Sequence, residues 1–333
     1  MAAIDLEKFS WFSAHGFSAL TMAMLLGMLI GNTIYRSFGE YAGSGVAFSK
    51  QHFLRAGVVL YGLRLTLQDI GHVGVAGVVI DASVLVSTFA WAWFIGTKLL
   101  KLDHQTAMLV GAGSAICGAA AVMATEPVLK ARAEKVTVAI STVVVFGTLA
   151  IFVYPAIYQL NRVFGFMPSG SNAFGVYAGS TIHEVAQVVA AANSVSAAAA
   201  DTAVIAKMVR VMMLAPFLIL LSGWMACGAR QEVDDALPHD KKTLAIPWFA
   251  FLFIGVVFFN SLNLLTASTR LLCNQVDTFL LAMAMGALGL TTHFSAIRHA
   301  GVKPLLLAAI LFVWLVVGGA VMNVGISRLW GLF

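Results

Sequence analysis

The feature that most constrains this chain is a series of long, continuous apolar runs that fill most of its 333 residues. A helix needs about 20 apolar residues to cross a bilayer, and several of these runs reach that length. Hydrophobic residues make up 60% of the chain and charged residues 11%, whereas a soluble domain has about 45–50% and about 25%. So few charges cannot cover a water-facing surface, which disfavours a soluble enzyme, a nucleic-acid binder and a disordered chain. The sequence predicts an all-α polytopic membrane protein.

Ten apolar segments are separated by short polar stretches, and we expect each segment to form a transmembrane helix. The segments are too continuous for barrel strands, in which apolar and polar residues alternate. The longest hydrophilic stretch is Gly228–Thr243, which is expected to be a solvated loop. The expected spans lie near residues 16–34, 49–71, 74–99, 105–129, 136–159, 173–194, 202–227, 245–265, 276–297 and 303–326.

The order of the segments indicates an internal repeat. Segments three to five align with segments eight to ten at an offset of 172 residues, which places Cys117 on Gly289. The first two segments align with the sixth and seventh at an offset near 155 residues, which places Arg55 on Arg210. Because five is an odd number, the two copies would have opposite orientations in the membrane, as in many secondary transporters. We therefore expect one membrane domain of two inverted five-helix repeats, 1–160 and 161–333, with chance alignment of apolar helices as the alternative.

Small residues in the fourth segment predict an interrupted helix. Gly111, Gly113 and Gly118 lie within eight residues, and glycine is unfavourable inside a helix. An interruption would point the N-terminus of a half-helix, with its positive dipole end, at the membrane centre, where it can bind an anion. The ninth segment is glycine-rich at the aligned position, so we expect two discontinuous, crossing helices, with close packing of intact helices as the alternative. The expected substrate-binding residues are Gly113, Ser114, Ile116, Cys117, Gly118, Gly289, Thr291 and Thr292.

Polar residues in the sixth segment occupy positions i, i+3, i+4 and i+7, which places them on one face of a helix. Ionisable groups at membrane depth are costly and normally face the bundle interior or a water-filled cavity. We expect this set to couple transport to protons or sodium, with Glu184 as the first candidate to carry a proton. A structural network that joins helices is the alternative. The residues are Ser180, His183, Glu184 and Gln187.

The same segment invites comparison with the zinc-protease motif HExxH, because it reads His183-Glu184-Val185-Ala186-Gln187. Gln187 replaces the second histidine of that motif. No other His/Asp motif offers further ligands at suitable spacing. An intramembrane metal-dependent hydrolase is therefore a remote alternative, and we expect no metal, no cofactor and no enzymatic activity.

Three charged residues are expected to act as charge partners inside the membrane: Arg55, Glu126 and Arg210. The two arginines could neutralise an anionic substrate, pair with Glu126 or Glu184, or extend to the membrane interface. For Lys207, extension along the helix to the membrane interface is the expected outcome.

Several of these stretches together resemble the YeiH-type family of proposed sulfate exporters. The matching stretches are Gly111–Lys130 (GAGSAICGAAAVMATEPVLK), Lys135–Tyr158 (KVTVAISTVVVFGTLAIFVYPAIY), Phe174–Ala191 (FGVYAGSTIHEVAQVVAA), Lys207–Leu221 (KMVRVMMLAPFLILL) and Phe279–His293 (FLLAMAMGALGLTTH). The resemblance covers nearly the whole chain from Gly16 onward, and relatives of this type carry a further apolar helix before that point. It implies a multi-pass transporter of the bacterial inner membrane that handles sulfate or a related sulfur oxyanion. That family is in turn similar to the sodium/proton antiporter and bile-acid symporter superfamily, which has crossed discontinuous helices.

Together these observations predict a secondary active transporter that exports a small anion by alternating access. The expected partners are an anionic substrate such as sulfate or a sulfonate, a coupling proton or sodium ion, membrane lipid and a second copy in a homodimer, but no nucleic acid. A transporter of another small organic solute is an alternative. A sensor or assembly scaffold is another, although no signalling domain fits in this length.

Overall fold

The computed structural model describes residues 19–35, 39–168, 170–228, 248–292 and 301–330, and every regular element among them is helical. The expected all-α class is therefore confirmed. Short π-helical segments occupy Ser49–Phe53, Ile95–Leu99 and Trp314–Gly318, and a 3₁₀ turn occupies Gly62–Arg64. The α-helices are α3 (Ala19–Asn32), α4 (Gly39–Phe48), α5 (Leu54–Tyr61), α6 (Leu67–Phe94), α7 (His104–Ala115), α8 (Ala119–Leu129), α9 (Ala133–Phe164), α10 (Ser171–Thr181), α11 (Val185–Asn193), α12 (Ala197–Met212), α13 (Leu214–Gly228), α14 (Trp248–Ser261), α15 (Ala267–Thr291), α17 (Val302–Val313) and α18 (Gly319–Leu329).

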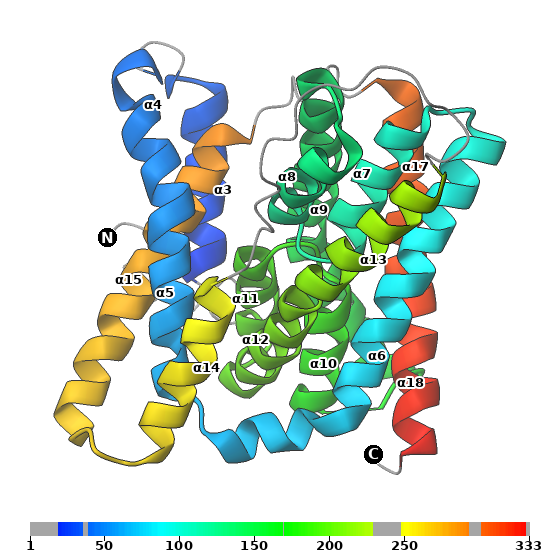
Figure 1. Ribbon diagram of the computed structural model, residues 1–333. Coiled ribbons are helices and arrows are strands. Elements are labelled where there is room, and N and C mark those ends of the chain that lie inside the picture. Colours follow the sequence, from blue (N-terminus) through cyan, green and yellow to red (C-terminus); the bar gives the residue numbers. More distant parts are fainter. Residues whose placement is uncertain (1–18, 36–38, 169, 229–247, 293–300, 331–333) are drawn as a thin grey trace.

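The helices form two groups that lie side by side (Figure 1). The small bundle consists of α3, α4, α5, α14 and α15, and the large bundle consists of α6 to α13 with α17 and α18. Helix α6 connects the bundles and is kinked at Gly74, whose φ of +53° is a conformation that glycine adopts easily. Segments from both halves of the sequence therefore meet within each bundle.

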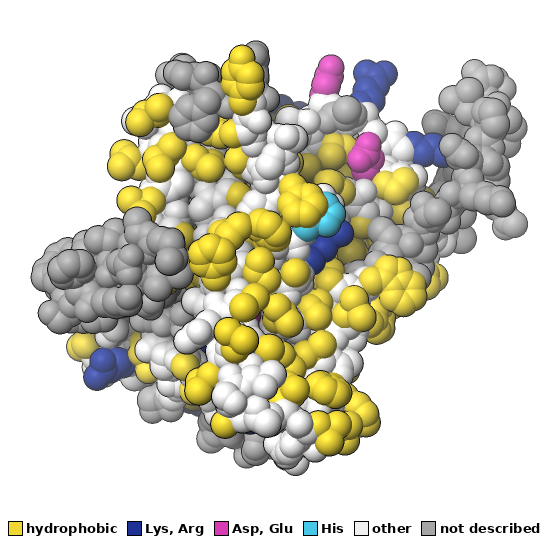
Figure 2. Space-filling view, turned by 90° about the vertical axis from the view of Figure 1, so that its left-hand side faces the viewer, with side chains coloured by type: hydrophobic (Ala, Val, Ile, Leu, Met, Phe, Trp, Pro, Cys, Tyr) yellow, Lys and Arg dark blue, Asp and Glu magenta, His cyan; other side chains and the backbone are white. Residues whose placement is uncertain are grey.

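Five helical segments among the described residues are long and apolar enough to cross a membrane: Gly74–Leu99, Glu134–Phe164, Ala197–Met225, Ala267–Thr291 and Val302–Leu329. The other expected spans are shorter helices or helices interrupted by non-helical residues, so ten spans stay a prediction. Figure 2 shows that hydrophobic side chains dominate one face of the molecule and that charged ones there are few. Such a surface is suited to lipid, since water-facing surfaces need more charge. Most of the expected Gly228–Thr243 loop lies outside the described residues.

Two helices of the large bundle are broken near their middle. The fourth segment stops being helical at Ile116–Gly118, between α7 and α8, and Gly118 has a φ of +72°. That interruption confirms the sequence prediction. A second interruption separates α10 from α11 at Ile182–Glu184, in the sixth segment.

The glycine-rich stretch of the ninth segment is helical, because α15 runs unbroken from Ala267 to Thr291, and the rest of that segment, from residue 293 on, lies outside the described residues. Its glycines allow close packing against α3 instead. A Cβ on Gly289 would lie 2.3 Å from the carbonyl oxygen of Met24, and a Cβ on Gly27 would lie 2.3 Å from the carbonyl oxygen of Gly286. Small residues here bring two intact helices together. Of the two aligned glycine-rich stretches, the first is interrupted and the second is helical up to Thr291, and the inverted repeats stay a prediction.

Candidate binding site at the helix breaks

Two cations on α12 bind the backbone at both breaks. Lys207 Nζ donates hydrogen bonds to the carbonyl oxygens of Ile116, at 2.8 Å, and Ile182, at 2.5 Å. Arg210 binds the carbonyl of Ala115 through Nε, at 2.7 Å. Its two terminal nitrogens bind the carbonyls of Ser114 and Ser180. Lys207 and Arg210 are both fully buried.

These contacts have a simple electrostatic cause. The last carbonyls of a helix have no partner within the helix and carry the negative end of its dipole. The breaks place the C-terminal ends of α7 and α10 inside the protein, where water cannot satisfy those carbonyls. Buried cations do so instead, one lysine and one arginine serving both half-helices. Lys207 therefore does not extend to the interface as expected, and Arg210 binds carbonyls rather than Glu126 or Glu184.

Asp81 on α6 provides negative charge near these cations. Its side chain is fully buried, and neither carboxylate oxygen has a hydrogen-bond partner among the described residues. It interacts electrostatically with Arg210 and Lys207. Its role is not evident from the sequence, since one aspartate in an apolar run does not reveal which cations lie opposite.

The N-terminal ends of the other two half-helices converge on one carboxylate. Glu184 is the N-cap of α11 and accepts a hydrogen bond from the N–H of Gln187, while the Gln187 side chain accepts one from the N–H of Glu184 at 3.1 Å. Oε1 of Glu184 also accepts from the N–H of Ala119, the first residue of α8, at 3.3 Å. A carboxylate complements the positive end of a helix dipole. Glu184 therefore joins the N-termini of α8 and α11.

The predicted single helical face of the sixth segment is wrong, because the helix is broken between Thr181 and Val185. Ser180 lies in the last turn of α10, where its Oγ donates to the carbonyl of Tyr177 and accepts from Asn323. His183 lies in the break, stacks on Phe312, and has no hydrogen-bond partner at Nδ1. Glu184 and Gln187 therefore share the cap of α11, whereas Ser180 and His183 have other environments, and of the four only Glu184 lines the cavity described next.

A cavity of about 300 Å³ lies between the two bundles beside Glu184. The large bundle contributes residues of the first break, of α8 and of α11, and the small bundle contributes the segment before α5, with α5, α14 and α15. Two cations, Lys50 and Arg55, are among the lining residues. The lining residues are Ala47, Lys50, Gln51, Leu54, Arg55, Val58, Cys117, Ala119, Ala120, Met123, Glu184, Val185, Ala186, Phe249, Ala284 and Leu288.

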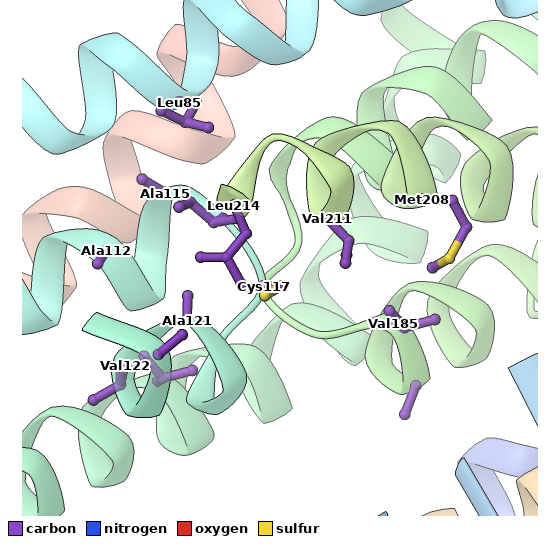
Figure 3. Close-up of a cluster of buried hydrophobic side chains, with 14 of the residues drawn as sticks. Leu85, Ala112, Ala115, Cys117, Ala121, Val122, Val185, Met208, Val211 and Leu214 are labelled. Atoms are coloured by element: carbon purple, nitrogen blue, oxygen red, sulfur yellow. The ribbon is translucent and has the colours of Figure 1, made fainter. Parts of the chain in front are cut away.

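Apolar side chains from several helices enclose the first break. Figure 3 shows Cys117 in the non-helical segment, with Ala121, Val185, Val211 and Leu214 around it. All of these side chains belong to one buried cluster. Apolar surroundings exclude water and so strengthen the interactions between the charged groups and the helix ends.

The structure brings together only part of the predicted site. Cys117, Glu184 and Arg55 line the cavity, and Gly118 lies directly beneath Glu184, where a Cβ would be 2.4 Å from the glutamate Cγ. Other residues of the fourth segment form the end of α7 and the break: Gly113, Ser114 and Ile116. Glu126, half-buried on α8, does not line the cavity and forms no ion pair with a described residue.

The predicted ligands from the ninth segment lie elsewhere. Gly289 packs on α3, and the hydroxyls of Thr291 and Thr292 donate to carbonyls of their own helix, including that of Leu288. The cavity wall from α15 is formed by Ala284 and Leu288. Lys50, which does line the cavity, was not singled out by the sequence analysis because it lies in a polar, partly exposed stretch.

Among the described residues, no three His, Cys, Asp or Glu side chains come close enough to hold a metal ion. His183 and Gln187 also do not share a helix face, since α11 begins at Val185. An HExxH site requires both ligands on one side of a continuous helical turn. His183 and Gln187 do not have this arrangement.

A second polar network joins the bundles farther along α5. Tyr61, three residues after the cavity residue Val58, donates a hydrogen bond to Asp201 of α12 at 2.9 Å. Arg64 forms an ion pair with the buried Asp277 of α15 at 2.7 Å and lies 4.8 Å from the centre of the Tyr61 ring. The sequence analysis did not anticipate this network.

The fold and the buried charges define a multi-pass helical membrane protein in which two broken helices meet beside a cavity. The chain matches the family described as "Conserved hypothetical protein 698" over residues 1–308. It is 58% identical to a UPF0324 membrane protein of Pseudomonas aeruginosa over 317 residues, which is 95% of this chain and 88% of the relative. It is 56% identical to the UPF0324 inner membrane protein YeiH of Escherichia coli K12 over 308 residues, or 92% and 86% of the two chains. No solved structure matches.

The chain belongs to the UPF0324 (YeiH) family of membrane proteins. The resemblance found in the sequence is therefore confirmed. The family and the apolar helices identify a multi-pass protein of the bacterial inner membrane, as predicted.

Proposed function

We propose that the protein is a secondary transporter that moves a compact anion through the cavity beside Glu184. The observation that carries this proposal is the accumulation of positive groups there. Lys50 and Arg55 line the cavity, and the N-terminal ends of α8 and α11 meet at its wall. Helix N-termini and basic side chains are the two elements from which proteins build anion sites. A cavity of about 300 Å³ also lies within the range typical of small-molecule sites.

The position of the cavity supports transport rather than static binding. Its walls come from two different bundles, so a displacement of one bundle against the other would change which side of the membrane the cavity faces. Secondary transporters commonly place substrate between two bundles, at the ends of discontinuous helices.

The resemblance to sulfate exporters makes sulfate, or a related sulfur oxyanion or sulfonate, the first substrate class. Transport of this anion is coupled to a proton carried by Glu184, and sodium is the alternative coupling ion. Glu184 is the one titratable carboxylate on the described cavity wall.

Counterflow of labelled sulfate tests this function. Purified protein is reconstituted into liposomes loaded with unlabelled sulfate, and the uptake of external label is followed against empty liposomes. We expect uptake above the control for the wild type and at least a tenfold lower rate for Arg55→Gln, which removes a cavity cation. Glu134→Gln is the matched control because Glu134 is an exposed residue in the first turn of α9. Absence of counterflow by folded protein for sulfate, thiosulfate, sulfite and alkyl sulfonates would contradict the proposal.

A further inference from the structure

We propose that the Glu184 carboxylate is a tethered competitor that occupies the position of the transported anion, so that the anion binds only after Glu184 is neutralised and displaced. This inference rests on the proposed function and specifies how the site couples its anion to a proton. It assigns Glu184 an additional role as the resident anion of the empty site.

The hydrogen bonds of Glu184 are those that a bound anion would make. Its carboxylate accepts from Ala119 at the start of α8 and from Gln187 in the first turn of α11. These are backbone donors from two different helices, which are 11 and 9 residues long. A free oxyanion in the cavity would seek the same converging donors. Ala119 itself lines the cavity, so the occupied position is open to a substrate.

The Glu184 side chain also blocks the site sterically. The Glu184 side chain lies directly on the first break, where a Cβ on Gly118 would be 2.4 Å from Cγ and 2.9 Å from Oε1 of Glu184. There is accordingly no space between the carboxylate and the break for a second anion. A substrate can reach the N–H of Ala119 only if the Glu184 carboxylate leaves it.

The balance of charge around the cavity also separates the two anions. The groups that act on Glu184 are Lys50 before α5, Lys207 on α12, and the neighbouring thiol of Cys117. Arg55 on α5 lines the same space, whereas α14 and α15 contribute only Phe249, Ala284 and Leu288. With Glu184 ionised, its charge offsets one of the two cavity cations. A divalent anion that entered beside it would add like charge in a poorly hydrated space, which is strongly unfavourable.

Protonation of Glu184 removes this unfavourable interaction. When a proton binds a carboxylate oxygen of Glu184, the neutral acid loses its charge-assisted hydrogen bonds and can turn away from Ala119. The anion then takes both the backbone donors and the cavity cations. When the anion leaves, the carboxylate loses its proton and returns. One proton is thereby bound with each anion, and the binding of either promotes binding of the other by the same factor.

Equilibrium binding of radiolabelled sulfate as a function of pH tests this coupling. For the wild type we expect the apparent Kd to rise by about tenfold per pH unit on the alkaline side, because one proton must be taken up for each anion bound. Glu184→Gln, which mimics the neutral acid, should bind sulfate at pH 8 at least tenfold more tightly than the wild type and with little pH dependence. Glu134→Gln should retain the wild-type profile. A Glu184→Gln protein with the wild-type affinity and slope overturns the inference.

Labelling of Cys117 gives a readout that requires no transported substrate. Cys117 lines the cavity next to Glu184, and it can be made the sole thiol with Cys227→Ser and Cys273→Ser. Adding Glu184→Gln should raise the labelling rate by a negatively charged thiosulfonate several-fold relative to a neutral one of similar size. A ratio that does not change overturns the competitor role. If wild-type counterflow persists in that case, the proposed function stands; if counterflow fails while the ratio rises, the substrate assignment is at fault.

Discussion

The two glycine-rich segments of this protein have similar compositions and opposite structures. Around Gly111–Gly118 the chain leaves the helix, and buried cations bind the carbonyls that are released. Around Gly286–Gly289 the helix continues, and its glycines bring α3 into backbone contact. Glycine lowers the conformational energy of a helix break and also permits close approach of two intact helices. What differs is the partner, since the first segment lies against Lys207 and Arg210 whereas the second lies against the glycines of α3.

A helix break inside a membrane protein therefore requires a group that satisfies the freed backbone. An unsatisfied buried carbonyl costs on the order of 1–3 kcal/mol, and more where no water is available. α12 supplies cations to the C-terminal ends of α7 and α10, while Glu184 serves the N-terminal ends of α8 and α11. At each break, positive side chains thus bind the C-terminal helix end and a negative side chain binds the N-terminal helix end, which complements the helix dipoles.

The strongest challenge to this account is removal of the shared cation. Lys207→Met keeps the length of the side chain but leaves the carbonyls of Ile116 and Ile182 without their donor. We expect a loss of about 2–5 kcal/mol in the free energy of unfolding, measured as a lower thermal midpoint in detergent, and loss of sulfate counterflow. Lys135→Met makes the same chemical change at an exposed ion pair and should cost less than about 1 kcal/mol. Equal effects of the two substitutions would contradict a special role for Lys207.

A second challenge compares two glycines of one helix. A Cβ on Gly289 would lie 2.3 Å from the Met24 carbonyl oxygen, whereas a Cβ on Gly286 has its nearest neighbour at 3.8 Å. Gly289→Ala should therefore cost about 1–3 kcal/mol through overpacking, while Gly286→Ala should be neutral or stabilise through its higher helix propensity. Thermal midpoints of the two variants check this. Tolerance of both substitutions would show that α15 does not need close contact with α3.

The smallest expected effect concerns the N-terminal end of α7, which is the end opposite to the break. Asp103 caps α7 through the N–H of Thr106 and pairs with Lys135 at 2.6 Å. Partial burial raises the pKa of Asp103, but the hydrogen bonds from Lys135 and Thr106 outweigh burial and hold this pKa below its usual value. The ion pair therefore stabilises the folded protein above the unfolded pKa, and this contribution is lost as the pH falls through the lower folded pKa.

Asp103→Asn keeps a good cap and removes only the charge. We expect a loss of less than about 1 kcal/mol at pH 7, and a smaller decline in stability between pH 7 and pH 3 than in the wild type. Unfolding midpoints across this range measure the difference. A variant whose decline matches that of the wild type would show that the pair contributes nothing.

The sequence allowed prediction of those features that depend on local composition. The apolar runs predict the helical membrane class, and the glycines of the fourth segment predict its break. The break in the sixth segment was missed because Ile182 and His183 carry no local signal for it, and the regular spacing from Ser180 to Gln187 favoured a helix. The break instead depends on contacts distant in sequence, such as that of Glu184 with Ala119.

The role of Lys207 likewise depends on contacts that are distant in sequence. A lysine in an apolar helix can extend to the interface or bind buried carbonyls, and only the positions of the neighbouring helices decide between these outcomes. Of the predicted site residues, Arg55, Cys117 and Glu184 meet at the cavity because α5, the first break and α11 pack together there. No pattern within one segment could show that these three lie side by side.

The most direct test of the account is to locate the anion. Crystals grown at mildly acidic pH with selenate, which replaces sulfate and scatters anomalously, would show its position. We expect an anomalous peak in the cavity within hydrogen-bond distance of the Ala119 N–H and the Arg55 guanidinium, with the Glu184 carboxylate turned away. A cavity without a peak, or a peak beside a Glu184 that still accepts from Ala119, would contradict it.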